Sequence, residues 1–239
     1  MSVLIRKYDT RVNSHLSRGA PSSLRTCRIR NAIVAAVSRW ALLSLCRKRQ
    51  SARAGARASW IFGFLVAVVG IAFLALLKSP ATAARATGQW LLWCTAPFLL
   101  GLASAPRVRD RQDGIEAMVL VRGGRAVELA TARTFAAMFG VTLRLLLPAL
   151  LFALAAASVA GPRASLLQAA LLSGFACFAG ILLGGIAALA GEAAGARGRE
   201  LFMAIVLVPW VLADVASEPL WSIPGLLNAG LSLIEVALA

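Results

Sequence analysis

The chain has 239 residues, of which 59% are hydrophobic and only 15% are charged, and its formal net charge is +15. An ordinary soluble domain is about 45–50% apolar and about 25% charged, so this composition excludes one. The positive charge is also unevenly placed, because residues 1–59 hold 13 basic residues and one acid. These features predict an all-α, polytopic helical membrane protein with a basic N-terminal arm.

Residues 1–59 fall into two parts. We expect residues 1–30 to be a flexible basic arm, because Arg and Ser are frequent there and no hydrophobic period is sustained. Residues 31–59 are predicted to form a surface helix and a basic linker, since the apolar stretch 31–46 is too short to span a membrane and has Arg39 at its centre. The basic residues that follow would hold this helix to anionic lipid. A stop-transfer charge cluster with no helix of its own is the alternative.

Residues 60–239 are predicted to form the transmembrane domain. A helix needs about 20 mainly apolar residues to cross roughly 30 Å of hydrocarbon. Six stretches approach this length, at about 60–77, 89–105, 135–160, 165–190, 201–216 and 222–239. The last is the weakest because Pro224 and Glu235 interrupt it, so five spans with a re-entrant last segment is the alternative to six.

The positions of Lys and Arg predict the orientation of the spans. With the N-terminus in the cytoplasm, the cytoplasmic segments hold 21 of the 25 basic residues, and the external loops hold only Lys78, Arg85 and Arg163. Orientation thereby accounts for the charge, and no nucleic-acid partner is expected. The expected location is the bacterial cytoplasmic (inner) membrane.

The four Cys form no C-x-x-C and the single His has no metal-ligating neighbours, so we expect no cofactor and no metal site.

Residues 106–134 are the only long polar connection predicted between spans, and they face the cytoplasm in this topology. Ile115, Met118 and Val119 recur at helical spacing, which predicts a short amphipathic helix that begins near Asp113. The glycine pair that follows ends this helix, and a second helix continues into the next span. A cytosolic motor would need a rigid lever of this kind to act on a membrane subunit.

This arrangement resembles the permease subunits of type 2 ABC transporters. The resemblance rests on the basic arm and surface helix, two spans, a cytoplasmic loop D-R-x-D-G-I-E followed by an apolar run and R-G-G-R-x-x-E-L, and then a long pair of spans. It covers roughly residues 31–239, and LVPW at 207–210 and SEPLWSIPGLL at 217–227 also resemble the family's last outer region. In that family the matching loop is the coupling helix that docks on a cytosolic ATPase subunit. The resemblance therefore implies an ATPase-coupling set: Asp110, Arg111, Asp113, Gly114, Ile115, Glu116, Arg125 and Glu128.

Other interpretations of the same loop stay open. The chain contains no G-x-x-x-x-G-K-[ST] phosphate loop, so the permease interpretation requires a separate ATPase. The resemblance also implies a second permease, identical or different, as a partner. A haem-exporter permease of cytochrome c maturation has a similar D-G-x-x-E loop. The stretch from Asp110 to Ala117 also resembles the D-x-x-D-G-x-x-A start of CDP-alcohol phosphotransferases. Met118 replaces that family's Arg, and no Asp lies between Asp113 and Asp214, which leaves too few carboxylates for its metal site. We therefore do not expect an enzyme; a passive membrane scaffold is the remaining alternative.

Two features lie within the predicted spans. Arg144 is a cation inside span three, where a charge costs roughly 2.5–3.5 kcal/mol on insertion scales. It is expected either to snorkel or pair with a carboxylate such as Asp214, or to line a translocation path. The Gly180-x-x-x-Gly184 motif predicts a close helix approach, within the chain or between two copies.

Overall fold

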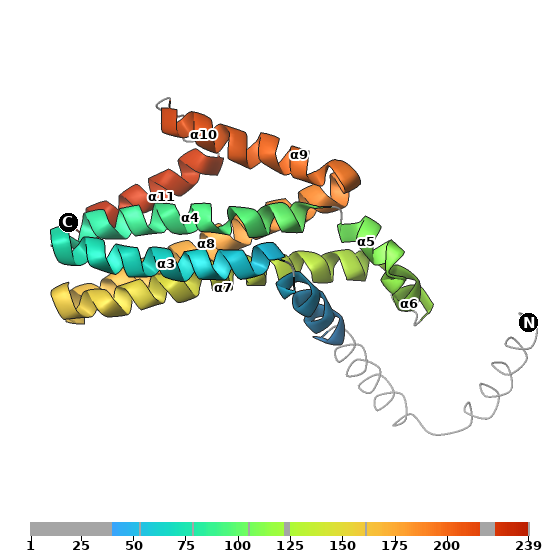
Figure 1. The fold of residues 1–239 in the computed structure, drawn as a ribbon, viewed down its shortest axis with the longest axis horizontal. Helices are drawn as coiled ribbons and strands as arrows, with labels where there is room; N and C mark the ends of the chain where they lie inside the picture. Colours follow the sequence, from blue (N-terminus) through green and yellow to red (C-terminus); the bar gives the residue numbers. More distant parts are fainter. Residues whose placement is uncertain are drawn as a thin grey trace, which may run out of the picture. The chain divides into compact units, whose positions relative to one another are not determined.

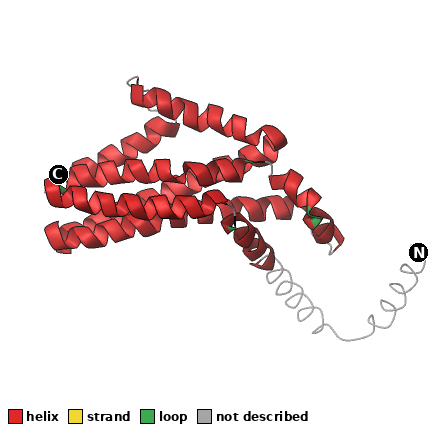
Figure 2. Ribbon diagram, viewed as in Figure 1, coloured by secondary structure: helices red, strands yellow, loops and turns green. Residues whose placement is uncertain are grey.

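The computed structural model describes residues 40–52, 54–77, 79–104, 106–121, 125–160, 162–215 and 223–238. In these ranges nearly every residue is helical and none lies in a strand, which confirms the predicted all-α class (Figure 2). The chain divides into two units, Met1–Ala41 and Leu42–Ala239. The predicted basic arm, 1–30, and residues 31–39 of the predicted surface helix lie outside the described residues.

The first described helix runs over residues 40–51, and we call its part in the second unit, residues 42–51, the basic helix. The elements that follow are α3 (Ala54–Leu77), α4 (Pro80–Ala103), α5 (Pro106–Gln112), α6 (Ile115–Val121), α7 (Ala126–Ala160), α8 (Pro162–Ala194), a 3₁₀ turn (Gly195–Arg197), α9 (Gly198–Phe202), a π-helical turn (Met203–Leu207), α10 (Val208–Val215) and α11 (Ile223–Leu238) (Figure 1). Helices α3 and α4 begin earlier than the spans predicted at 60 and 89. Their first turns are rich in Ala, a strong helix former, and are less apolar than a span requires.

Three stretches of the described chain are long and apolar enough to cross a membrane: Gly55–Leu76, Ala126–Ala156 and Leu166–Leu212. The third includes the turn Gly195–Arg197, and α11 is a shorter apolar helix. Large apolar side chains also lie exposed along α3, among them Ile61 and Leu76. Such a surface suits lipid better than water. These lengths and compositions indicate an integral membrane protein.

The most extensive contact between helices joins α7 and α8. Two glycines of α8 make it close, because a Cβ atom at Gly180 would lie 2.5 Å from Cα of Thr142, and one at Gly184 would lie 2.8 Å from Cα of Met138. The small-residue motif is therefore used within the chain, between α8 and α7, where glycine allows two helix backbones to approach. The first turns of α7 run without a break into the predicted third span, as the sequence predicts.

After α8 the chain reverses direction at Gly195, whose φ of 55° is a conformation that favours glycine. The return is tight, since a Cβ atom at Gly198 would lie 2.3 Å from the carbonyl oxygen of Ala103 at the end of α4. This reversal brings the turn Gly195–Arg197 beside α5. The ends of α4 and α8 and the loop helices are thus packed into one region, which holds the candidate site.

Candidate functional site

The loop between α4 and α7 folds as two short helices that meet at Gly114. The φ of Gly114 is +68°, and its N–H donates to the carbonyl of Arg111 at 3.1 Å. A glycine at this position ends α5 without the penalty that a side chain would incur there. The sequence predicted one helix from about Asp113; the structure instead places α6 from Ile115 and adds α5 before it.

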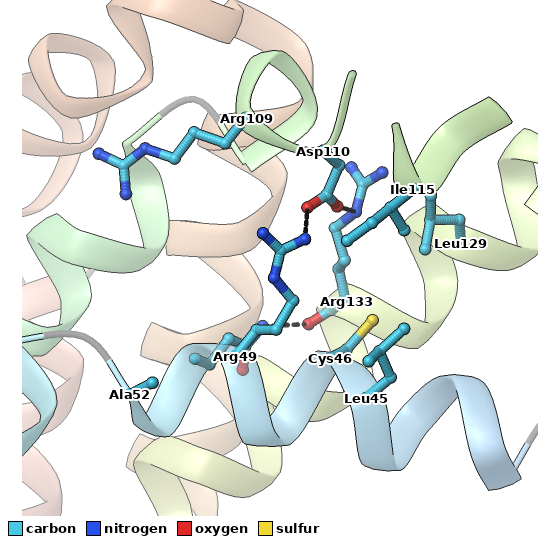
Figure 3. A pocket seen from close by; sticks show the side chains of 10 residues that line it. Leu45, Cys46, Arg49, Ala52, Arg109, Asp110, Ile115, Leu129 and Arg133 are labelled. Carbon is cyan, nitrogen blue, oxygen red and sulfur yellow. Dashed lines mark hydrogen bonds and ion pairs between the residues drawn. The ribbon is translucent and has the colours of Figure 1, made fainter. Parts of the chain in front are cut away.

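Asp110 of α5 is the centre of a charge network. Its side chain is only 14% exposed, and each carboxylate oxygen has its own cationic partner. Arg49 of the basic helix donates to Oδ1 at 2.9 Å, and Nε of Arg133, on α7, lies 2.9 Å from Oδ2. Figure 3 shows both guanidinium groups turned toward this carboxylate from different helices. Asp110 therefore ties the loop to the basic helix and to α7.

Arg133 extends the network to a fourth element. Its residue surface is 6% exposed, and its guanidinium also pairs with Glu192 near the end of α8. Gln50 donates from Nε2 to the Arg133 carbonyl oxygen at 3.2 Å, a second link between α7 and the basic helix. Arg49 pairs in addition with Asp113. Breaking a buried ion pair of this kind is costly, because removing one partner leaves the other charge uncompensated.

A cavity of about 320 Å³ lies beside the network (Figure 3). Its lining includes Cys46, Arg49, Arg109, Asp110 and Arg133. Figure 3 shows Arg109 extended away from Asp110. Burial raises the pKa of the Cys46 thiol to about 11, and the Asp110 charge adds to the rise while the two paired arginines oppose it. The thiol therefore stays protonated near neutral pH and packs as a small apolar group.

The remaining residues of the predicted coupling set mostly serve the local fold. Arg111 donates from Nε to Glu116 at 2.7 Å, so this pair bridges α5 and α6. Ile115 packs against the apolar cluster that contains Cys46. The backbone N–H of Arg125 donates to the Glu128 carboxylate at 3.3 Å, which is half of a capping box at the start of α7. These contacts occupy most of the polar groups that the resemblance assigns to docking.

Apolar side chains of α6 remain on the surface. Val121 is 87% exposed, Leu120 is 52% exposed and Met118 is 42% exposed. We call these three residues the α6 apolar edge. Three exposed apolar residues on a seven-residue helix form a surface that suits contact with another protein. The sequence pattern placed Met118 on the apolar stripe of the predicted helix with Ile115 and Val119, and it indicated no role for Leu120 and Val121.

Arg144 of α7 is buried, with 5% of its surface exposed. It donates from Nε to Oγ of Ser59 at 2.9 Å and from Nη1 to the Gly140 carbonyl at 2.7 Å. Ser59 lies in the second turn of α3, so Arg144 lies level with the start of that helix. The proposed pairing with Asp214 stays a prediction, because the Asp214 side chain lies outside the part of α10 that the structure describes.

Comparisons with protein-family models, with curated proteins and with solved structures find no match to this chain. Within the described ranges, no three His, Cys, Asp or Glu residues lie together as a metal site would need. Arg49, Arg133 and Glu192 are the network members that sequence reasoning missed. The sequence assigned Arg133 only to membrane orientation, and it assigned Arg49 to orientation and to contact with anionic lipid. Arg49 lies 61 residues from Asp110, and Arg133 lies 59 residues from Glu192. The available signal was the near balance of charge in the loop, where Arg133 is one of six Arg facing four acids.

Proposed function

We propose that this chain is the membrane-spanning subunit of a type 2 ABC transporter, moving its substrate with energy from ATP hydrolysis by a separate ATPase subunit. The observation that carries the proposal is the helix pair α5–α6, which the network joins to the basic helix, α7 and α8. A short helix pair tied to several longer helices is what transmission of force from a cytosolic motor requires. The likeness of the loop to the family's coupling helix supports the same conclusion.

The proposal includes a topology of six spans with a cytoplasmic N-terminus. Helices α3, α4, α7, α8 and α11 supply five of them, and the stretch from α9 to α10 supplies the other. The distribution of Lys and Arg supports this orientation. We further propose the bacterial inner membrane as the location and pairing with a second permease, identical or different, as the assembly.

Within the site we divide the work between two sets of residues. One set connects the helices to one another and consists of Asp110, Arg133 and Glu192. Their charges are paired inside the chain and are little exposed. The α6 apolar edge is the surface that contacts the ATPase. Exposed apolar side chains gain free energy when a partner removes them from water, at roughly 25 cal/mol per Å². Movement of the ATPase against this edge would then be transmitted to α7 and α8 through the ion pairs of Asp110, Arg133 and Glu192.

Val121→Glu tests the proposal at its most exposed position. A charged side chain at 87% exposure leaves the fold intact but opposes burial against an apolar partner surface. The tagged chain should co-purify with a subunit that carries a phosphate loop and hydrolyses ATP, and Val121→Glu should lose most of that subunit. Lys48→Glu, an exposed change on the basic helix, is the matched control and should retain it.

Three results would contradict the proposal. The first is purification of the wild-type chain without an ATPase. The second is equal retention of the partner by Val121→Glu and Lys48→Glu. Metal-dependent lipid phosphotransfer by the purified chain would instead establish the enzyme alternative. Circular dichroism and the thermal midpoint of each variant in detergent separate loss of binding from loss of folding.

A further inference from the structure

A second, smaller cavity of about 80 Å³ lies between the basic helix, the second turn of α3, the last turns of α4 and the part of α7 from Ala136 to Arg144. One water needs about 10–15 Å³ by this measure, so the space admits a polyatomic group. Its polar lining is basic or neutral: Arg47, Gln50, Ser51, Trp60 and Arg144. No carboxylate lines it among the residues that the structure describes. The cavity therefore presents two positive charges with no negative charge beside them.

The surroundings of Arg144 are neutral on every side for which the structure gives a contact. Its guanidinium bonds to the Ser59 hydroxyl and the Gly140 carbonyl, and its Cζ lies 3.7 Å from the centre of the Phe98 ring. The Trp60 ring is the next nearest, at 5.3 Å. Hydrogen bonds and ring faces orient and attract a guanidinium, but they do not neutralise its charge, and burying a charge without a counter-charge is costly.

Arg47 approaches the same cavity from the basic helix. Its Cζ lies 4.7 Å from the centre of the Phe139 ring, which holds the exposed side chain against α7. Two like charges that line one cavity repel each other, and an anion between them would replace repulsion with attraction. Gln50 also lines the cavity, and its buried side-chain oxygen Oε1 accepts no hydrogen bond in the structure. Gln50 lines both this cavity and the larger one beside the network, so this oxygen does not by itself identify the ligand.

We propose that this cavity binds a phosphate group between Arg47 and Arg144, either in the headgroup of an anionic phospholipid or as free phosphate. Guanidinium groups form paired, planar hydrogen bonds with phosphate oxygens, and they do so better than an ammonium group. The location fits a headgroup, since Ser59 and Trp60 lie in the second turn of α3. Basic pockets between membrane helices on the cytoplasmic side of a membrane bind anionic phospholipid headgroups. The site does not depend on an ATPase partner.

Thermal unfolding of the full chain, purified in uncharged detergent and freed of lipid, tests the site. Dioleoylphosphatidylglycerol should raise the unfolding midpoint, and dioleoylglycerol, which has the same chains without phosphate, should not. Arg47→Gln should weaken the apparent affinity for phosphatidylglycerol roughly tenfold, the usual consequence of losing charged hydrogen bonds. Lys48→Gln removes a neighbouring exposed charge that does not line the cavity and should stay within about twofold of wild type.

Further measurements distinguish a lipid headgroup from free phosphate, and they keep the test decisive if a variant fails to fold. Stabilisation by inorganic phosphate, with displacement of phosphatidylglycerol, assigns free phosphate; a response to phosphatidylglycerol alone assigns the headgroup. Arg144→Lys keeps the charge but loses the planar fork, and should also bind more weakly; should it fail to fold, Arg47→Gln still decides. Equal effects of the two lipids without a response to phosphate, or equal losses in Arg47→Gln and Lys48→Gln, would overturn the proposal.

Discussion

The charge network predicts a large effect for Arg133→Leu. Removing one member of a buried ion pair costs about 3–5 kcal/mol, because its partner is left charged and unpaired. Asp110 keeps Arg49 in this variant, so Glu192 is the main group left without its partner. The Asp110 and Glu192 side chains are 14% and 18% exposed and retain some water, which favours the lower end of that range, about 3 kcal/mol. At about 2–4 °C per kcal/mol, the thermal midpoint should fall by roughly 6–12 °C.

The assay is thermal unfolding in detergent, monitored by helical circular dichroism, with two comparison variants. Arg133→Leu/Glu192→Leu removes both charges and should recover more than half of the loss, since an apolar replacement of a whole buried pair is often close to neutral. Arg199→Leu, at an exposed arginine of α9, should change the midpoint little. A fall of less than about 2 °C for Arg133→Leu, below the effect of one kcal/mol, would refute the network as a structural support.

Four further outcomes follow from individual contacts. Gly180→Ala should destabilise the chain by roughly 1–3 kcal/mol, because its Cβ would lie 2.5 Å from an α7 backbone atom. The control is Gly174→Ala on the same helix, whose Cβ meets nothing within 4 Å and which should be neutral or stabilising. Thermal unfolding in detergent compares the two variants. With the other cysteines replaced by Ser, Cys46 at pH 8 should react with maleimide roughly a hundredfold more slowly than an ordinary thiol, because its pKa is raised from 9.0 to about 11. Its raised pKa also predicts that stability is unchanged below pH 9 and falls between pH 9 and 11, where only the unfolded thiol ionises, and Cys46→Ala should remove that dependence. Arg85→Gln removes a solvent-accessible pair with Glu235 and should lower stability by less than about 1 kcal/mol in the same unfolding assay.

Hydropathy predicted the long helices, because a long run of apolar residues is the sequence pattern of a membrane-spanning helix. It could not predict α5, since PRVRDRQ has no apolar period and its first and last residues would suit a loop equally well. The tertiary environment makes it helical: Gly114 closes the turn after it, and Asp110 receives two arginines from other elements. The early starts of α3 and α4 have a related cause, because a helix can continue through residues that are too polar to count as a span.

The site was predictable as a place but not as a set of contacts. Asp110 was identified from its motif, yet the partner that holds it from the basic helix lies 61 residues away in sequence. Arg133 and Glu192 are 59 residues apart, and each reads in the sequence as an ordinary charge at the end of a span. No local pattern encodes such pairs, because they depend on how α7, α8 and the basic helix pack.

These contacts change which residues can test the proposed function. Glu116 was the natural target from the motif, but its carboxylate bonds to Arg111 and bridges α5 to α6. Glu116→Arg would place two like charges in contact and disturb the helix pair, so a lost partner would have two explanations. The conformation of Gly114 and the pairing of Asp110 likewise account for two motif residues by folding alone. A chain could therefore keep much of the D-R-x-D-G-I-E pattern for stability without binding an ATPase, and only the α6 apolar edge separates docking from folding.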